Sequence, residues 1–279
     1  MTREEALALC EATVRRAEPD RYFASLFAPA EKRPLLFALY AFNHELTRIG
    51  ETAREPMMAE IRLEWWREAL DSAGEGRPRG HPAAIGLAEI FACAPPPREL
   101  FERVVDAHSV DTAPLPFSDF GSLEANAESS SAALMEIAAH VLDVWDEAHE
   151  LSREAGIAYG LTANLRATPR NVARGRLTLP GDLLAAAGLS PADAVSGRNP
   201  DALRRVAAQV AERARTHYRR ARGMRAPRAA FAAFLPASLV PAYLSRLTRM
   251  RTDPLREPHD ISQLRRQLIL LRAALLGRL

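Results

Sequence analysis

Residues 31–51 read Glu-Lys-Arg-Pro-Leu-Leu-Phe-Ala-Leu-Tyr-Ala-Phe-Asn-His-Glu-Leu-Thr-Arg-Ile-Gly-Glu, and this stretch decides the fold class. Positions 35–42 are apolar on every side of a helix, which is typical of a helix buried in a core. From Asn43 onward, polar side chains crowd the end of the same helix. They indicate either a solvated helix terminus or one wall of a site, and the pattern alone leaves both open.

Helical periodicity continues along nearly the whole chain, and no alternating pattern predicts a strand. We expect helices at 3–17, 21–27, 31–50, 56–69, 83–92, 97–109, 122–142, 146–166, 182–187, 200–222, 236–250 and 260–276. Asp20 is expected to cap the second of these helices. Neither a repeat nor a long linker divides the sequence, so residues 1–279 are predicted to form a single all-α domain.

Composition narrows the class of protein. With 48% hydrophobic and 26% charged residues, the chain resembles a globular protein and not a disordered one. No apolar run approaches the roughly 20 residues that a membrane span needs. Residues 1–5 do not have the pattern of a signal peptide. Because Cys10 and Cys93 form neither a disulfide framework nor a zinc-ligand spacing, we expect a cytoplasmic protein.

Charge is unevenly distributed along the sequence. Residues 201–279 contain 17 arginines and 5 acids, whereas the preceding part contains 20 basic residues and 30 acids. This asymmetry predicts either a basic face that meets an anionic partner or mutual neutralisation of the two parts within one fold. The anionic partners considered are a phosphate group, a membrane surface and an acidic protein, and nucleic acid is not expected.

The stretch 159–180 combines small side chains with arginines. Small residues at Gly160, Ala163 and Ala167 keep one side of a helix slim, which permits close approach by a neighbour or a ligand. Arginines follow at positions 166, 170, 174 and 176, and a guanidinium suits phosphate oxygens. The alternative is that these arginines pair with the acids at 147, 150 and 154.

Five segments carry a family resemblance when they are taken in order. They are Phe37–Phe42, Arg62–Glu68 with its Trp65-Trp66 pair, Leu165-Arg166, Arg174–Pro180, and Leu235-Pro236 through Tyr243-Leu244. In this order they resemble the squalene/phytoene synthase family of all-α isoprenoid synthases over nearly the whole chain. The resemblance implies an isoprenoid-synthase helical bundle around a central apolar cavity, between the helices at 31–50 and 146–166. We expect the tryptophan pair to serve mainly structure, on a helix that closes the bundle.

The family's metal-binding residues are missing from this sequence. Active members hold Mg²⁺ with two aspartate-rich motifs, because Mg²⁺ prefers carboxylate oxygens and must neutralise a diphosphate leaving group. By alignment, the first motif falls on residues 47–51, including Thr47, Arg48 and Glu51, and Arg48 puts a positive charge where a cation should sit. The second motif falls on Ala167 and Asn171. We therefore predict no metal site and assign no catalytic residue.

Carboxylates elsewhere in the sequence offer a way to rebuild a metal site. The candidates are Glu45, Glu51, Glu60, Glu64 and Asp143. We expect most of them to be on the surface or paired. In place of a metal site, the resemblance implies an anionic head-group or diphosphate site formed by Tyr40, Arg166, Arg174 and Arg176.

The sequences of two segments are similar to those of a family branch whose metal motifs are degenerate. These segments are Ala41-Phe42-Asn43-x-Glu45-Leu46 and Leu165–Pro169. The branch includes an assembly factor for mitochondrial respiratory complex I. This likeness implies a non-catalytic assembly role with a complex I subunit or assembly intermediate as partner, and an isoprenoid or lipid ligand. One alternative is a prenyl-diphosphate transferase with a rebuilt Mg²⁺ site. Another is a peripheral lipid-binding protein that uses its basic C-terminal half on the inner face of the plasma membrane.

Overall fold

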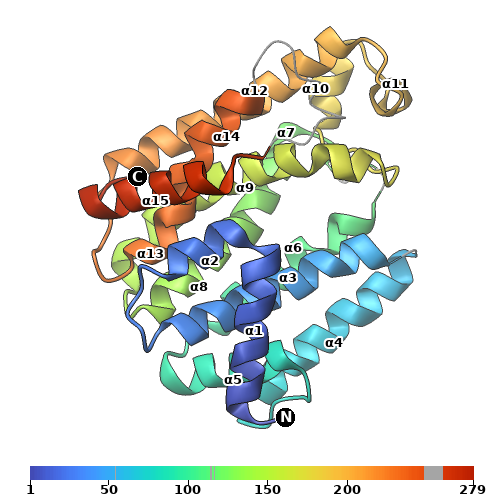
Figure 1. The fold of residues 1–279 in the computed structure, drawn as a ribbon. Coiled ribbons are helices and arrows are strands. Elements are labelled where there is room, and N and C mark those ends of the chain that lie inside the picture. Colours follow the sequence, from blue (N-terminus) through green and yellow to red (C-terminus); the bar gives the residue numbers. More distant parts are fainter. Residues whose placement is uncertain (54, 114, 116, 248–259) are drawn as a thin grey trace.

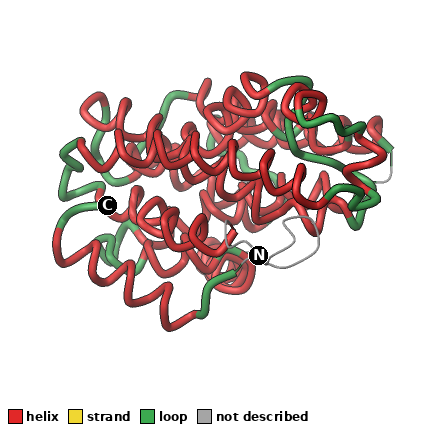
Figure 2. The backbone as a smooth tube through the Cα atoms, turned by 90° about the horizontal axis from the view of Figure 1, so that it is seen from above, coloured by secondary structure: helices red, strands yellow, loops and turns green. Residues whose placement is uncertain are grey.

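The structure is a computed structural model that describes residues 1–279 except 54, 114, 116 and 248–259. The part of the chain that it describes contains helices and loops but no strand (Figures 1 and 2). The all-α prediction is therefore confirmed. Among these described helices, none combines the length and the apolar character needed to cross a membrane.

Fifteen α-helices and four short helices of other types follow one another along the described chain. The α-helices are α1 (Arg3–Ala17), α2 (Pro19–Ser25), α3 (Arg33–Thr52), α4 (Pro56–Gly74), α5 (Pro82–Cys93), α6 (Arg98–Ala107), α7 (Phe120–Ala127), α8 (Ala133–Val141), α9 (His149–Val172), α10 (Gly181–Ala186), α11 (Pro191–Val195), α12 (Pro200–Gly223), α13 (Phe231–Phe234), α14 (Val240–Leu247) and α15 (Gln263–Leu276). The short helices are η1 (Ser109–Thr112), η2 (Glu128–Ala132), η3 (Asp146–Ala148) and η4 (Leu235–Leu239).

Helix α9 is the central element of the bundle. It packs against α12 on one side and against η2, α8 and α7 on the other, while α3 packs against α1 and α5 (Figure 1). The close approach of α9 to η2 requires glycine, because a Cβ atom at Gly156 would lie 2.2 Å from Ala132 Cα. At Gly160 a Cβ would lie 3.0 Å from Ser131 Oγ. Of the small residues predicted on the slim side of this helix, Gly160 packs against η2, whereas Ala163 and Ala167 line a cavity.

Most predicted helices are present, with differences at particular turns. The single helix expected at 122–142 is interrupted by the π-helical turn η2, which turns Ser130 and Ser131 toward α9. Helix α9 runs past its expected end and continues through Pro169 to Val172. The loop expected at 188–199 contains α11. The helix expected at 236–250 is divided between η4 and α14, and its last residues lie outside the described chain.

Two smaller expectations can also be judged. Asp20 is not a helix cap: it lies inside α2, whose N-cap is Glu18, and its carboxylate bonds to distant residues instead. Cys10 is buried, Cys93 is exposed, and both are free thiols. Cys10 is part of the hydrophobic core, and this burial raises the pKa of its thiol to about 12.

The two tryptophans of α4 have different environments. Trp66 is buried, with its ring centroid 5.3 Å from that of Phe42 on α3. Trp65 is half-buried, and Arg79 lies over its ring at 5.5 Å. Trp66 therefore belongs to the core that joins α3 and α4, whereas Trp65 packs on the edge of that core with part of its ring open to solvent.

We predict that Trp66→Ala lowers the free energy of unfolding by about 3–5 kcal/mol, because it leaves a cavity against Phe42. Trp65→Ala should cost clearly less, since part of its ring already faces solvent. Urea unfolding of the two variants and the parent measures both effects. Equal losses, or no loss for Trp66→Ala, would contradict this assignment.

Candidate functional site

A cavity of about 440 Å³ lies between α3 and α9 and is closed by α2, α7 and η2. Its position between these two helices is the one predicted from the sequence. Apolar side chains such as Phe117, Leu123 and Ala163 share its walls with many polar ones. The walls are therefore less apolar than the family resemblance implies. The polar groups gather at two ends, one around Glu51 and the other around Asp20.

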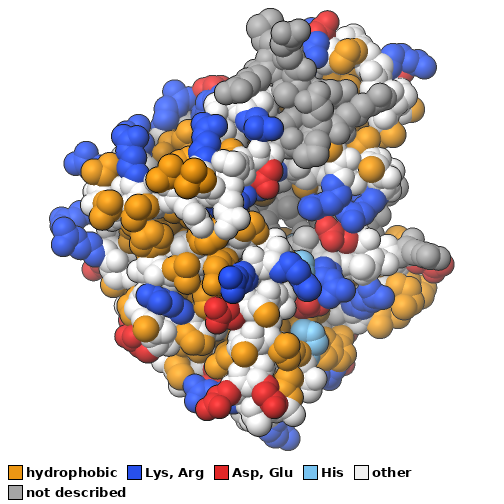
Figure 3. Space-filling view, in the orientation of Figure 1, with side chains coloured by type: hydrophobic (Ala, Val, Ile, Leu, Met, Phe, Trp, Pro, Cys, Tyr) orange, Lys and Arg blue, Asp and Glu red, His pale blue; other side chains and the backbone are white. Residues whose placement is uncertain are grey.

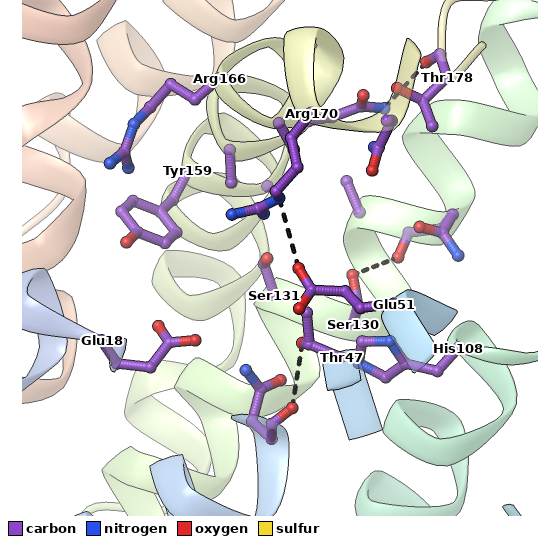
Figure 4. Close-up of a pocket in the computed structure, with 18 of the residues that line it drawn as sticks. Glu18, Thr47, Glu51, His108, Ser130, Ser131, Tyr159, Arg166, Arg170 and Thr178 are labelled. Carbon is purple, nitrogen blue, oxygen red and sulfur yellow. Dashed lines mark hydrogen bonds and ion pairs between the residues drawn. The ribbon is translucent and has the colours of Figure 1, made fainter. Parts of the chain in front are cut away.

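The Glu51 end brings together the positions of the two lost metal motifs. Thr47 and Glu51 face the cavity from α3, and Ala167 and Asn171 face it from α9. Figure 4 shows Arg170 reaching across from α9 toward Glu51, and its Nε lies 3.3 Å from a Glu51 oxygen. The positions of the two motifs face each other across the cavity, as the family alignment requires. The Glu51–Arg170 ion pair, however, lies between the two helices.

These residues do not fit a Mg²⁺ site. Among the motif positions, Glu51 alone carries a carboxylate, and Arg174 Nη1 lies 3.5 Å from the same Glu51 oxygen that Arg170 approaches. Mg²⁺ requires several hard oxygen donors, and a guanidinium beside the only carboxylate opposes a cation. Across the residues that the structure describes, no group of three or more His, Cys, Asp or Glu side chains is arranged to hold a metal ion.

Arg48 does not lie in the cavity, where the aligned metal motif predicts it. Its side chain contacts Glu45 at 3.3 Å and lines a separate surface pocket with Trp65, Trp66 and His81. The reason is the helical turn: Thr47 and Glu51, four residues apart, share the cavity face, whereas Arg48 lies one step round the helix. Arg170, from the opposite helix, provides the positive charge that was expected from Arg48.

The four predicted head-group residues lie at different places. Arg166 and Arg176 line the cavity, whereas Tyr40 and Arg174 are not among its lining residues. Tyr40 is buried beneath Arg21, whose guanidinium carbon lies 5.4 Å from the ring centroid, and burial raises the pKa of Tyr40 to about 12. Arg176 Nη2 donates to Asn171 Oδ1 at 3.3 Å. Their binding role stays a prediction.

The acids expected to pair with the arginines at 166–176 have other partners. Glu154 bonds to His217 at 2.8 Å and to Arg153 at 3.1 Å, and Glu150 also faces Arg153. In the part of the chain that the structure describes, the ion pairs of Glu150 and Glu154 are therefore with residues other than the arginines of 166–176. The partners are instead Asp20, Glu51 and Asp260. Local spacing missed them because all three come from distant parts of the sequence.

The other candidate carboxylates lie away from the cavity. Glu64 pairs with Arg67, Asp143 pairs with Lys32, and Glu60 is exposed. Glu45 lies with Arg48 at the surface pocket. Of the five candidates, the cavity lining includes Glu51 alone.

Asp20 forms the second polar end of the cavity. Asp20 is 3% exposed, and its carboxylate accepts hydrogen bonds from Tyr243 at 2.7 Å, Tyr159 at 3.0 Å and the Nε of Arg266 at 2.5 Å. Arg166 Nη1 adds a contact at 3.2 Å, and its guanidinium stacks on the Tyr243 ring at 3.7 Å. One carboxylate thus joins α2, α9, α14 and α15.

The charge of Asp20 is stabilised by these neighbours. Burial acts to raise the pKa of its carboxyl, but Arg166, the Tyr243 hydroxyl and Arg266 together hold that pKa below its ordinary value. Burial and the Asp20 carboxylate raise the pKa of Tyr159 and of Tyr243, so both hydroxyls stay protonated donors. The predicted ligand residue Arg166 is therefore part of a buried structural ion pair.

Comparison with known proteins identifies the family. The model of the squalene/phytoene synthase family matches residues 14–268, and the chain belongs to that family. A dehydrosqualene synthase structure superposes with a TM-score of 0.79 at 16% identity, covering 98% of this chain and 97% of that one. The isoprenoid-synthase fold expected from the sequence is confirmed.

The similar curated proteins include both assembly factors and synthases. NADH dehydrogenase (ubiquinone) complex I, assembly factor 6 from Bos taurus is 28% identical over 247 residues, which cover 88% of this chain and 74% of that protein. Presqualene diphosphate synthase from Rhodopseudomonas palustris is 26% identical over 199 residues, covering 71% of each chain. The predicted likeness to the assembly-factor branch is therefore confirmed.

We predict that Asp20→Asn lowers the free energy of unfolding by about 3–5 kcal/mol at neutral pH, because Arg166 and Arg266 lose their buried counter-charge. The folded-state pKa of Asp20 lies below the unfolded value. The ionised carboxylate therefore contributes fully to the free energy of unfolding above about pH 4, and this contribution is lost as the pH falls through the folded pKa. The difference between parent and variant should therefore shrink in acid.

Urea unfolding between neutral pH and about pH 3 measures this difference. Asp201→Asn is the matched control, since the Asp201 carboxylate is mostly exposed where it pairs with Arg204. A difference for Asp20→Asn that stays constant with pH would show that Asp20 stabilises the fold without its charge.

Proposed function

We propose that this protein is an assembly factor for respiratory NADH dehydrogenase that uses the isoprenoid-synthase cavity for binding and not for prenyl transfer. The observation that carries the proposal is the Glu51–Arg170 ion pair in the place where the family's chemistry requires metal-bound carboxylates. The similarity to complex I assembly factor 6 supports the choice of partner, a subunit or assembly intermediate of that complex. We place it on the cytoplasmic side of the membrane that holds the enzyme.

The cavity would bind an isoprenoid or lipid with an anionic head group, without metal or other cofactor. Arg170 and Arg174 both approach Glu51, so two guanidinium groups face one carboxylate at that end and the local charge favours an anion. Apolar side chains of the lining, among them Phe117 and Leu123, would contact the tail. Arg166 also lines the cavity, but its pairing with Asp20 and Asp260 gives it mainly a structural role in this proposal.

A prenyl-diphosphate transferase is the second candidate, supported by the similarity to presqualene diphosphate synthase. It would need Mg²⁺ held by residues other than those at the two motif positions. The proposals differ in whether a prenyl diphosphate is only bound or also ionised.

We expect farnesyl and geranylgeranyl diphosphate to bind without turnover. Incubation with Mg²⁺ or Mn²⁺ should release pyrophosphate no faster than a protein-free blank. Calorimetry in EDTA should show binding that weakens about tenfold in Arg170→Gln, since a charge-assisted hydrogen bond is lost.

Glu45→Gln is the matched control for binding, because Glu45 pairs with Arg48 outside the cavity. Presqualene diphosphate synthase serves as the positive control for turnover. Pyrophosphate release that EDTA abolishes would reject the non-catalytic proposal in favour of a transferase. Binding that is equal in the parent and in Arg170→Gln would reject the head-group site.

A further inference from the structure

Helix α15 presents a row of exposed leucines to solvent. Leu264, Leu268, Leu271 and Leu275 follow one another at intervals of four, three and four residues, which places them on one face of the helix. Their exposed fractions are 66%, 56%, 45% and 77%. Solvated helix faces normally carry polar side chains, so a continuous apolar row indicates a surface that meets something else.

The opposite face of α15 fixes this orientation. Leu270 and Ala273 are buried in a hydrophobic cluster with residues of α2, α13, η4 and α14. Arg266 on the same inner face is 4% exposed, and it bonds to Asp20 at 2.5 Å and to Asp260 at 2.9 Å. The helix cannot rotate its leucines inward without breaking this buried ion pair.

The charged side chains of α15 and of the residues that follow it are all positive. Residues 261–279 contain four arginines and no acid. Arg265 and Arg272 are exposed and lie seven residues apart along one side of the row, and Arg278 follows the end of the helix. Figure 3 shows hydrophobic side chains gathered over the position of α15, with Lys and Arg side chains around them.

We propose that α15 docks the protein on an anionic lipid bilayer. An amphipathic helix with an apolar face and flanking arginines lies in the membrane interface, where its apolar side chains enter the acyl boundary and its arginines meet phosphate groups. The leucine row would supply the buried area, and Arg265 and Arg272 would supply the charge complementarity. A second copy fits less well, because its own α15 offers no carboxylate to these arginines.

Docking through this helix would place the membrane directly behind the Asp20 end of the cavity. Arg266 of α15 and Arg166 of α9 share the Asp20 carboxylate, and Arg166 and Asp20 both line the cavity. Membrane docking is compatible with either function considered above, so its test does not depend on which of them is correct.

The test is flotation of the full chain with phosphatidylcholine vesicles that contain about one-third phosphatidylglycerol. We expect the parent to float with these vesicles and not with pure phosphatidylcholine, and to dissociate as salt shortens the Debye length from about 10 Å to about 3 Å. Leu268→Gln with Leu271→Gln should abolish flotation. Arg265→Gln with Arg272→Gln should weaken it about fivefold for each arginine.

Leu9→Gln with Met57→Gln is the matched control, since it removes exposed apolar side chains from α1 and α4. Thermal melting of each variant checks that the fold is retained. Three results would overturn the proposal: no flotation of the parent, equal flotation of the leucine variant, or a parent dimer that the leucine substitutions dissociate. The last result would assign the leucine row to a second copy of the chain.

Discussion

The buried carboxylate of Asp20 holds together elements that lie far apart in the sequence. It accepts hydrogen bonds from Tyr159 on α9, Tyr243 on α14 and Arg266 on α15, and it pairs with Arg166. A buried carboxylate is costly unless every lone pair and the charge are matched, and here two guanidiniums and two hydroxyls match them. The relative positions of α2, α9, α14 and α15, and thus one wall of the cavity and the direction of the leucine row, depend on this group.

The cavity retains the architecture of its family while its charge pattern is different. In a metal-dependent synthase, facing carboxylates repel one another until cations are bound between them. In this chain Arg170 lies between α3 and α9 and neutralises Glu51 directly, so no cation is needed for the two helices to approach. Because Arg174 approaches the same carboxylate, two guanidinium groups face one acid, and on this basis we propose an anionic ligand in place of a metal ion.

Sequence reasoning predicted the helical class and the location of the cavity, because apolar periodicity and the ordered family motifs report packing directly. It placed Thr47, Glu51, Ala167 and Asn171 on facing helices correctly, since their spacing on each helix determines the face. It missed the direction of Arg48, although the one-residue step from Thr47 was enough to predict it. It also mistook Asp20 for a cap, because its partners Arg166, Tyr243 and Arg266 are 146 to 246 residues away. Tyr243 was part of one of the segments that carry the family resemblance, but nothing near it in the sequence indicates that its hydroxyl bonds to Asp20.

The central claim is that this member of a synthase family serves the assembly of another enzyme. The most direct measurement is deletion of its gene in the source organism, followed by native-gel quantification of assembled NADH dehydrogenase and analysis of squalene- and phytoene-type products. Our account predicts loss of the assembled complex with unchanged isoprenoid products, and rescue by the parent gene. Normal amounts of the complex together with loss of an isoprenoid product would contradict it.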